Sequence, residues 1–178
     1  MTSTAERLII CDASPLILLA KIDCLHLVTL LAHEVWIPRA VWEEVTINGR
    51  NHPESLLIQK QFPANVRDPD PLLEAAYSLM VDRGEAAALA LASHVTDPCL
   101  LMDDRKGRRV ADARGWRSMG TLGLLVRSKK TGHIESLSPY FGKLHQANWF
   151  IDPALLNEAL RAYKVFYKVF VRNRLLVN

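Results

Sequence analysis

The chain has 178 residues, of which 49% are hydrophobic and 23% charged, and its formal net charge is +3. This composition is typical of one globular domain with a hydrophobic core and excludes a disordered chain. No apolar run reaches the roughly 20 residues of a membrane-spanning helix, and the N-terminus lacks the order of basic, apolar and small residues of a signal peptide. We therefore expect a cytoplasmic protein without membrane contact.

Apolar runs, helix caps and turn residues define the predicted elements. Ser14 and Pro15 are typical of a helix N-cap and first turn, and Gly49 and Gly115 of helix ends. In chain order, the predicted elements are strand 8–11, helix 16–22, strand 35–37, helix 38–45, an extended piece near Val66, helices 72–81 and 85–94, strand 99–102, helix 105–113, strand 116–119, and helices 121–130, 135–146 and from 153 onward.

The alternation of strands and helices predicts an α/β fold, with a central, mainly parallel sheet and helices on both faces. We assign residues 1–150 to this domain and residues 151–178 to a C-terminal extension that is amphipathic, basic and aromatic. In the extension, a helix is favoured over a strand at 165–171. Its aromatic surface needs a cover, either the domain itself or a second protomer, so we expect a homodimer.

Charge is distributed unevenly along the chain. Residues 1–104 carry 7 Lys and Arg against 15 Asp and Glu, whereas residues 105–178 carry 15 against 4. An acidic half followed by a basic half suits an enzyme that acts on a polyanion through metal ions, because carboxylates can then lie beside a cationic surface. Two unrelated solvated faces are the alternative.

Acidic residues occur at the ends of predicted strands, at the start of a predicted helix and, as a pair, near the end of the predicted helix 38–45. They are Asp12, Glu43, Glu44, Glu85, Asp103 and Asp104. Ligands of parallel sheets collect at the carboxyl ends of the strands, so we expect Asp12 and the Asp103–Asp104 pair to meet there. Converging carboxylates repel one another unless a cation joins them, and oxygen-only ligands favour Mg²⁺ or Mn²⁺ over zinc.

Each acid also has a purely structural interpretation. Asp12 could form an Asx-turn, Asp82 with Glu85 matches a capping box, and Asp104 could be the N-cap of the basic helix. One of the two neighbouring glutamates at 43–44 is expected to be a solvated helix residue.

Other chemistries lack their patterns in this sequence. The six histidines show neither i, i+4 pairing nor HExxH spacing, and the three cysteines form no CxxC, so zinc sites and disulfides are disfavoured. Glycine-rich nucleotide-binding motifs are absent. A phosphoacceptor receiver domain would need a paired acid after the first strand and a solitary aspartate in mid-chain, and neither occurs.

Five segments carry motifs in a characteristic order: Cys-Asp-Ala-Ser-Pro-Leu-Ile (11–17), Ile-Pro-Arg-Ala-Val-Trp-Glu-Glu-Val (37–45), Arg-Gly-Glu-Ala-Ala-Ala-Leu-Ala-Leu-Ala (83–92), Leu-Leu-Met-Asp-Asp-Arg-Lys-Gly-Arg-Arg-Val-Ala (100–111) and Gly-Thr-Leu-Gly (120–123). Together they resemble PIN-domain proteins, and most closely the VapC-like toxins with a Gly-Glu-Ala motif. The resemblance spans roughly residues 8–145.

The resemblance implies a three-layer α/β/α sandwich that binds Mg²⁺ or Mn²⁺ through an acidic cluster and cleaves single-stranded RNA. The matching positions imply that the catalytic and metal-binding residues are Asp12, Glu44, Glu85 and Asp104, with Asp103 as an additional ligand or neighbouring group. Glu85 departs from the aspartate found in many members. Ser14 matches a hydroxyl residue that often lines the pocket, a role that competes with helix capping.

A basic helix follows the last acids. Its residues Arg105, Lys106, Arg108 and Arg109 would hold an RNA backbone if they lie near the phosphate site, and a solvated basic face is the alternative. We therefore expect a divalent-metal-dependent endoribonuclease that is the toxin of a toxin–antitoxin pair, with a small antitoxin protein as partner. A catalytically inactive PIN-like module that binds RNA or protein is the alternative.

Overall fold

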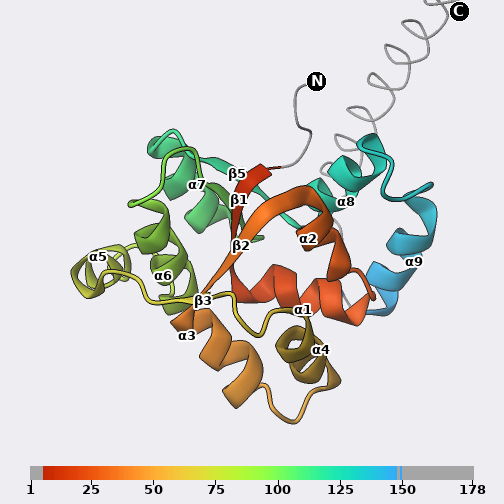
Figure 1. The fold of residues 1–178 in the computed structure, drawn as a ribbon, viewed down its shortest axis with the longest axis horizontal. Helices are drawn as coiled ribbons and strands as arrows, with labels where there is room; N and C mark the ends of the chain where they lie inside the picture. The colour runs from red at the N-terminus through yellow and green to blue at the C-terminus, as the bar shows by residue number, and fades with distance from the viewer. Residues whose placement is uncertain (1–5, 148, 150–178) are drawn as a thin grey trace, which may run out of the picture.

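The computed structural model describes residues 6–147 and 149, and Figure 1 shows how their helices and strands are arranged. The predicted C-terminal extension, with its helix, lies outside these residues. Five strands form one sheet in the order β3-β2-β1-β4-β5, and every neighbouring pair is parallel. The strands are β1 (Glu6–Cys11), β2 (Ala32–Pro38), β3 (Val66–Arg67), β4 (Cys99–Leu101) and β5 (Arg117–Met119). The predicted parallel sheet is confirmed.

Nine α-helices and one π-helical segment surround the sheet in the described part of the chain. They are α1 (Ala13–Lys21), α2 (His26–Leu31), α3 (Arg39–Trp42), η1 (Glu43–Asn48), α4 (Pro53–Gln61), α5 (Pro71–Tyr77), α6 (Arg83–Ala92), α7 (Arg105–Ala113), α8 (Thr121–Lys130) and α9 (Ser138–Gln146). The sequence patterns did not predict α2 or α4. Helix α2 has only six residues and follows Asp23, whose φ is 63°, and α4 buries only Ser55 and Ile58 of its nine residues.

The alternation of side chains along the central strands builds a core on each face of the sheet. Ile9 and Leu101 point into a core completed by α1, α2, α4, α8 and α9. Ile10 and Leu100, their neighbours, point into a second core made with α5, α6 and α7. Because both faces are covered, β1 and β4 are apolar almost throughout, which is typical of a parallel sheet. The fold is a three-layer α/β/α sandwich.

The predicted helix 38–45 changes from an α-helix to a π-helix where its two glutamates lie. In η1, the backbone N–H of Gly49 donates to the carbonyl oxygen of Glu44 at 3.0 Å, which is an i to i+5 bond. The hydroxyl of Thr46 donates to the carbonyl of Trp42 at 2.7 Å, and the buried hydroxyl of Ser55 donates to the carbonyl of Thr46 at 3.2 Å. These bonds fix the segment that carries Glu44.

A buried charged group closes the opposite, amino-terminal edge of the sheet. The carboxylate of Glu6, only 2% exposed, accepts hydrogen bonds from Arg117 on β5 and Arg127 on α8. Arg117 also donates to Asp97, at 2.9 and 3.1 Å. A buried carboxylate requires such partners. The network therefore joins the first strand to the last one on the side remote from the predicted acids.

Candidate active site

The predicted acids lie where β1, β4 and β5 end together. The backbone N–H of Asp12 donates to the carbonyl of Leu101, and that of Met102 to the carbonyl of Met119, both at 2.9 Å, so the chain stays paired beyond the strands. Asp12 is the N-cap residue of α1, although its side chain makes no capping hydrogen bond. The predicted N-cap at Ser14 is therefore wrong: Ser14 lies exposed inside the first turn of the helix.

Asp12 and Glu44 meet at Gly84. A Cβ atom placed on Gly84 would lie 3.0 Å from Oδ1 of Asp12 and 3.6 Å from Oε2 of Glu44. Burial, together with the negative charges of Asp82, Glu85 and Glu44, raises the pKa of Asp12 to about 7. Burial and the charge of Asp82 also raise the pKa of Glu44. The charge of Glu44 thus lies close enough to Asp12 to disfavour the charged form of Asp12.

Glu85 presents an oxygen that the protein does not satisfy. Its side chain is 2% exposed, and among the described residues its Oε1 is a buried side-chain atom without a hydrogen-bond partner. Burial and the charges of Asp82 and Asp104 raise the pKa of Glu85 to about 7. Backbone N–H groups of Asp82 and Gly107 lie near enough to oppose this shift in part, but neither satisfies Oε1.

Asp82 lies among these carboxylates although the sequence motifs assigned it only a cap. It does cap α6, since its Oδ1 accepts from the backbone N–H of Glu85 at 3.0 Å. Its charge nevertheless raises the pKa of Asp12, Glu44 and Glu85 alike. A sequence signal existed, because Asp82 lies two residues before Gly84 of the Gly-Glu motif, but its capping pattern offered a sufficient explanation.

Asp103 and Asp104 each accept hydrogen bonds from the first turn of a helix. Asp104 is the N-cap of α7, as its alternative structural interpretation allowed, and its Oδ1 accepts from the backbone N–H of Lys106 at 2.6 Å. Asp103 accepts from both the backbone N–H and the hydroxyl of Thr121, each at 2.7 Å. Asp103 therefore links the end of β4 to the start of α8, whereas Asp104 faces the pocket that contains Glu85.

The comparison with known families agrees with this geometry. The family model described as a PIN domain matches residues 8–164, which is most of the chain. The chain belongs to the PIN-domain family. PIN domains are generally nucleases. No curated protein and no solved structure matched the chain.

The basic residues predicted to bind RNA lie on α7, next to the acids of this PIN domain. Lys106 lines the same pocket as Glu85 and Asp104. A Cβ atom placed on Gly120 would lie 3.5 Å from the guanidinium of Arg108 and 2.6 Å from Oδ1 of Asp103. Arg108 and Asp103 therefore both lie at Gly120. Arg105 and Arg109 are exposed on the same helix. On the acidic side, Glu43 pairs with Arg83 at 3.4 Å.

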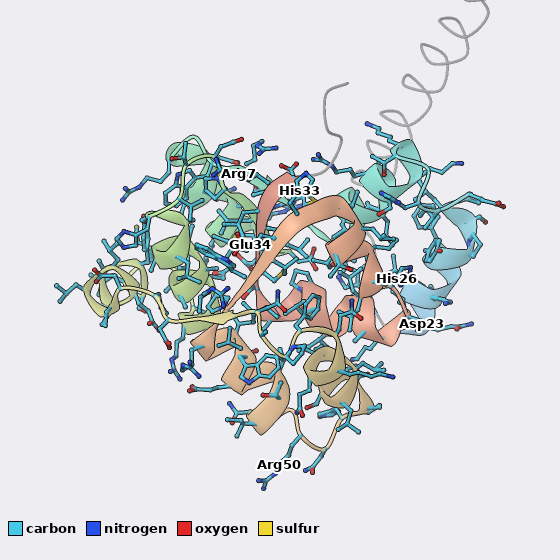
Figure 2. The ribbon with its side chains drawn as sticks, in the orientation of Figure 1. Arg7, Asp23, His26, His33, Glu34 and Arg50 are labelled. Carbon is cyan, nitrogen blue, oxygen red and sulfur yellow. The ribbon has the colours of Figure 1, made fainter. Side chains whose placement is uncertain are left out.

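No ready-made metal cage exists in the part of the PIN domain that the structure describes. There, no three carboxylate, imidazole or thiol side chains are grouped so that they could hold an ion as they stand. Figure 2 shows that His26 and His33 lie on different elements at the surface. The three cysteines are buried free thiols.

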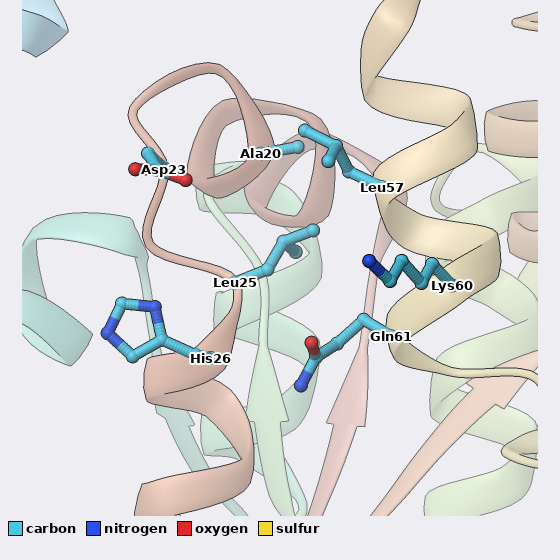
Figure 3. A pocket seen from close by; sticks show the side chains of 7 residues that line it. All are labelled: Ala20, Asp23, Leu25, His26, Leu57, Lys60 and Gln61. Carbon is cyan, nitrogen blue, oxygen red and sulfur yellow. The ribbon is translucent and has the colours of Figure 1, made fainter.

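A separate pocket lies between α2, α4 and the end of α1, and Figure 3 shows its lining. Lys60 and Gln61 project from α4 toward Leu25, while Asp23 and His26 lie at the other side. This pocket contains none of the predicted acids. Among the helices that the structure describes, none has the length and apolar character needed to cross a membrane.

Proposed function

We propose that this PIN domain is a Mg²⁺- or Mn²⁺-dependent endoribonuclease that cleaves RNA phosphodiester bonds. The observation that supports it best is the buried, unpartnered Oε1 of Glu85 among carboxylates whose pKa values are raised. A protein interior rarely leaves such an oxygen unsatisfied without a ligand or a catalytic role. A cation would satisfy this oxygen and remove the repulsion between the acids.

The available donors suit a hard divalent cation. Asp12, Glu44, Glu85 and Asp104 would hold it, and all of them offer carboxylate oxygens, the ligands that Mg²⁺ and Mn²⁺ prefer. Asp103 is a weaker candidate, because both of its oxygens are engaged by Thr121. A metal ion is thus supported by the donor chemistry and by the unpaired Glu85 oxygen, and not by a preformed cage.

Such an ion, when bound, supplies polarisation of the phosphate and activation of a water molecule. The protein's own contribution is to place the substrate beside the acids. Lys106 and Arg108 would bind phosphate oxygens of the RNA strand next to the acids, with Arg105 and Arg109 extending the cationic surface along α7. Ser14, exposed on α1 two residues after Asp12, would contact the strand from the other side.

We further propose that the protein is the toxin of a toxin–antitoxin pair and acts as a homodimer in the cytoplasm. The Gly-Glu-Ala and Gly-Thr-Leu-Gly motifs that resemble VapC-like toxins support this role. A small antitoxin protein would then be its partner. Growth arrest on expression, relieved by co-expression of a small antitoxin protein, is the expected result. Growth without arrest would contradict the toxin role.

One experiment tests the nuclease activity. The purified chain is incubated with a mixed single-stranded RNA pool in Mg²⁺, in Mn²⁺ and in EDTA, beside Asp12→Asn. Cleavage in either metal, abolished by EDTA and by the substitution, is the expected result. RNA binding without cleavage would instead favour the inactive module, an alternative consistent with the hydrogen bonds that already engage Asp103 and Asp104.

A further inference from the structure

The turn between α5 and α6 exposes two large apolar side chains. Leu79 is 88% exposed and Met80 52%, whereas Tyr77 before them and Val81 after them are buried. The backbone N–H groups of Met80 and Val81 both donate to the carbonyl of Tyr77, at 2.8 and 3.1 Å. Because the turn is anchored at both ends, it holds Leu79 and Met80 outward in a fixed position.

The anchor itself is held from two further elements. The hydroxyl of Tyr77 shares a hydrogen bond with the hydroxyl of Ser93 at 3.1 Å, just after α6. The guanidinium of Arg114 lies 5.4 Å from the centre of the Tyr77 ring, within the range of a cation–π contact. The exposed apolar pair is therefore built on a rigid base.

The same pair lines the pocket of the candidate active site. Leu79 and Met80 share this pocket with Glu85, Asp104 and Lys106. Its lining thus includes two large apolar residues beside carboxylates and one lysine. A nucleotide in a single strand has matching parts, namely a flat base with apolar faces and an anionic phosphate one sugar away.

We propose that Leu79 and Met80 form a subsite for the unstacked nucleobase next to the cleaved phosphate, with Lys106 binding a phosphate of the same strand. This subsite rests on the endoribonuclease function proposed above. A base that leaves the stack loses its contacts, and apolar side chains, including the polarisable methionine sulfur, replace them. Neither side chain has a strong hydrogen-bonding group, so the subsite favours unpaired RNA without selecting one base strongly.

A second copy of this chain fits the apolar pair less well. A symmetric contact through Leu79 would bring the acidic pockets of both copies, with Asp82, Glu85 and Asp104, toward each other. Like charges that face each other across an interface disfavour association. A nucleobase is uncharged, and Lys106 offsets the negative charge of the phosphate that accompanies it.

Abasic substrates test the subsite. Cleavage of a single-stranded oligoribonucleotide in Mn²⁺ is measured for the parent protein and for the double variant Leu79→Ala/Met80→Ala. It is repeated with an abasic nucleotide at each position flanking the cut. We expect one abasic position to lower kcat/KM of the parent by about tenfold to a hundredfold, and to have no further effect in the double variant. Leu72→Ala, on α5 and 82% exposed but outside the pocket, should respond as the parent does.

Three results would overturn the subsite. One is an equal abasic effect in the parent and the double variant. Another is loss of self-association by the double variant with its abasic response intact, which would identify a protein contact. The third is weaker Mn²⁺ binding by the double variant in a titration with the metal alone. If the parent cleaves no RNA, the endoribonuclease function fails separately. The affinities of the parent and the double variant for intact and abasic RNA are then compared by fluorescence anisotropy.

Discussion

A methyl group on Gly107 would lie 2.6 Å from Oε1 of Glu85, closer than Cβ atoms approach other heavy atoms in proteins. The first turn of α7 and the carboxylate at the start of α6 therefore fit together only because residue 107 is glycine. The same relationship recurs at Gly84 beside Asp12 and at Gly120 beside Asp103, at 3.0 and 2.6 Å. Glycine at these positions makes room for carboxylates.

Gly107→Ala should displace Glu85. In an unconstrained helix, replacing glycine by alanine stabilises by about 1 kcal/mol, and Gly142→Ala on α9, with nothing within 4 Å of its new Cβ, should show that gain. At position 107 we expect lower stability and Mn²⁺ affinity reduced by more than about tenfold. Chemical denaturation and calorimetric Mn²⁺ titration measure both effects. An equal gain in stability at both positions, with metal affinity unchanged, would contradict the contact.

Asp12→Asn and Asp104→Asn should abolish cleavage with the fold retained. Asparagine caps a helix about as well as aspartate, so α7 keeps its start. Removing a charge near Gly84 also relieves repulsion in the metal-free protein. RNA cleavage and circular dichroism are the measurements, with the exposed Asp112→Asn on α7 as the control. Full activity in either variant, with unchanged metal binding, would remove that residue from the site.

Glu85→Gln separates the metal-ligand role from the capping role. Glutamine can replace glutamate in a capping box, so stability should change by less than about 1 kcal/mol. A metal ligand tolerates the amide poorly, and cleavage should fall much further than stability. Parallel kinetic and urea-unfolding measurements compare the two effects. Near-normal turnover by this variant would leave the cap as the sole role of Glu85.

Asp103→Asn should keep most of the metal affinity, because both carboxylate oxygens of Asp103 accept hydrogen bonds from Thr121. Thr121→Val removes a buried hydrogen bond to a charged group and should destabilise by about 1.5–3 kcal/mol. Thermal unfolding and Mn²⁺ titration of both variants are the tests. Loss of Mn²⁺ binding by Asp103→Asn at unchanged stability would show that Asp103 is a metal ligand and not only a structural link between β4 and α8.

Stability of the metal-free protein should fall as the pH rises from about 4 to about 7. Asp12 and Glu85 have pKa values of about 7 in the folded protein and near 4 when unfolded, so over this range the folded state holds protons that the unfolded chain has lost. The loss is on the order of a few kcal/mol. Urea unfolding in EDTA measures it, and Asp12→Asn should remove part of the slope.

The same protons oppose a cation, so Mn²⁺ affinity should increase as the pH rises through about 7. Titrations at about pH 6 and pH 8 provide the comparison. Identical pH slopes for the parent and Asp12→Asn, in both stability and affinity, would show that Asp12 does not titrate in this range.

The sequence determined the elements whose signals are local. Apolar runs predicted β1 and β4. The alternative interpretation of Asp82 and Asp104 as helix caps could also be read from the sequence, because capping involves neighbours within three residues. Local signals also failed where they competed. Ser14 and Pro15 resemble a helix start, but the helix begins at Ala13, directly after β1 delivers Asp12 to the edge of the sheet.

Only the tertiary structure decided which carboxylates converge. Helical periodicity does not separate Glu43 from Glu44, and only the family resemblance favours Glu44. In the structure, the π-helical turn, fixed by the buried Ser55 of α4, brings Glu44 to Gly84 while Glu43 faces Arg83. The convergence depends on pairing between β1 and β4, about 90 residues apart in the chain, and on helix packing across the sheet. No periodicity encodes such contacts, because each depends on where another element ends in space.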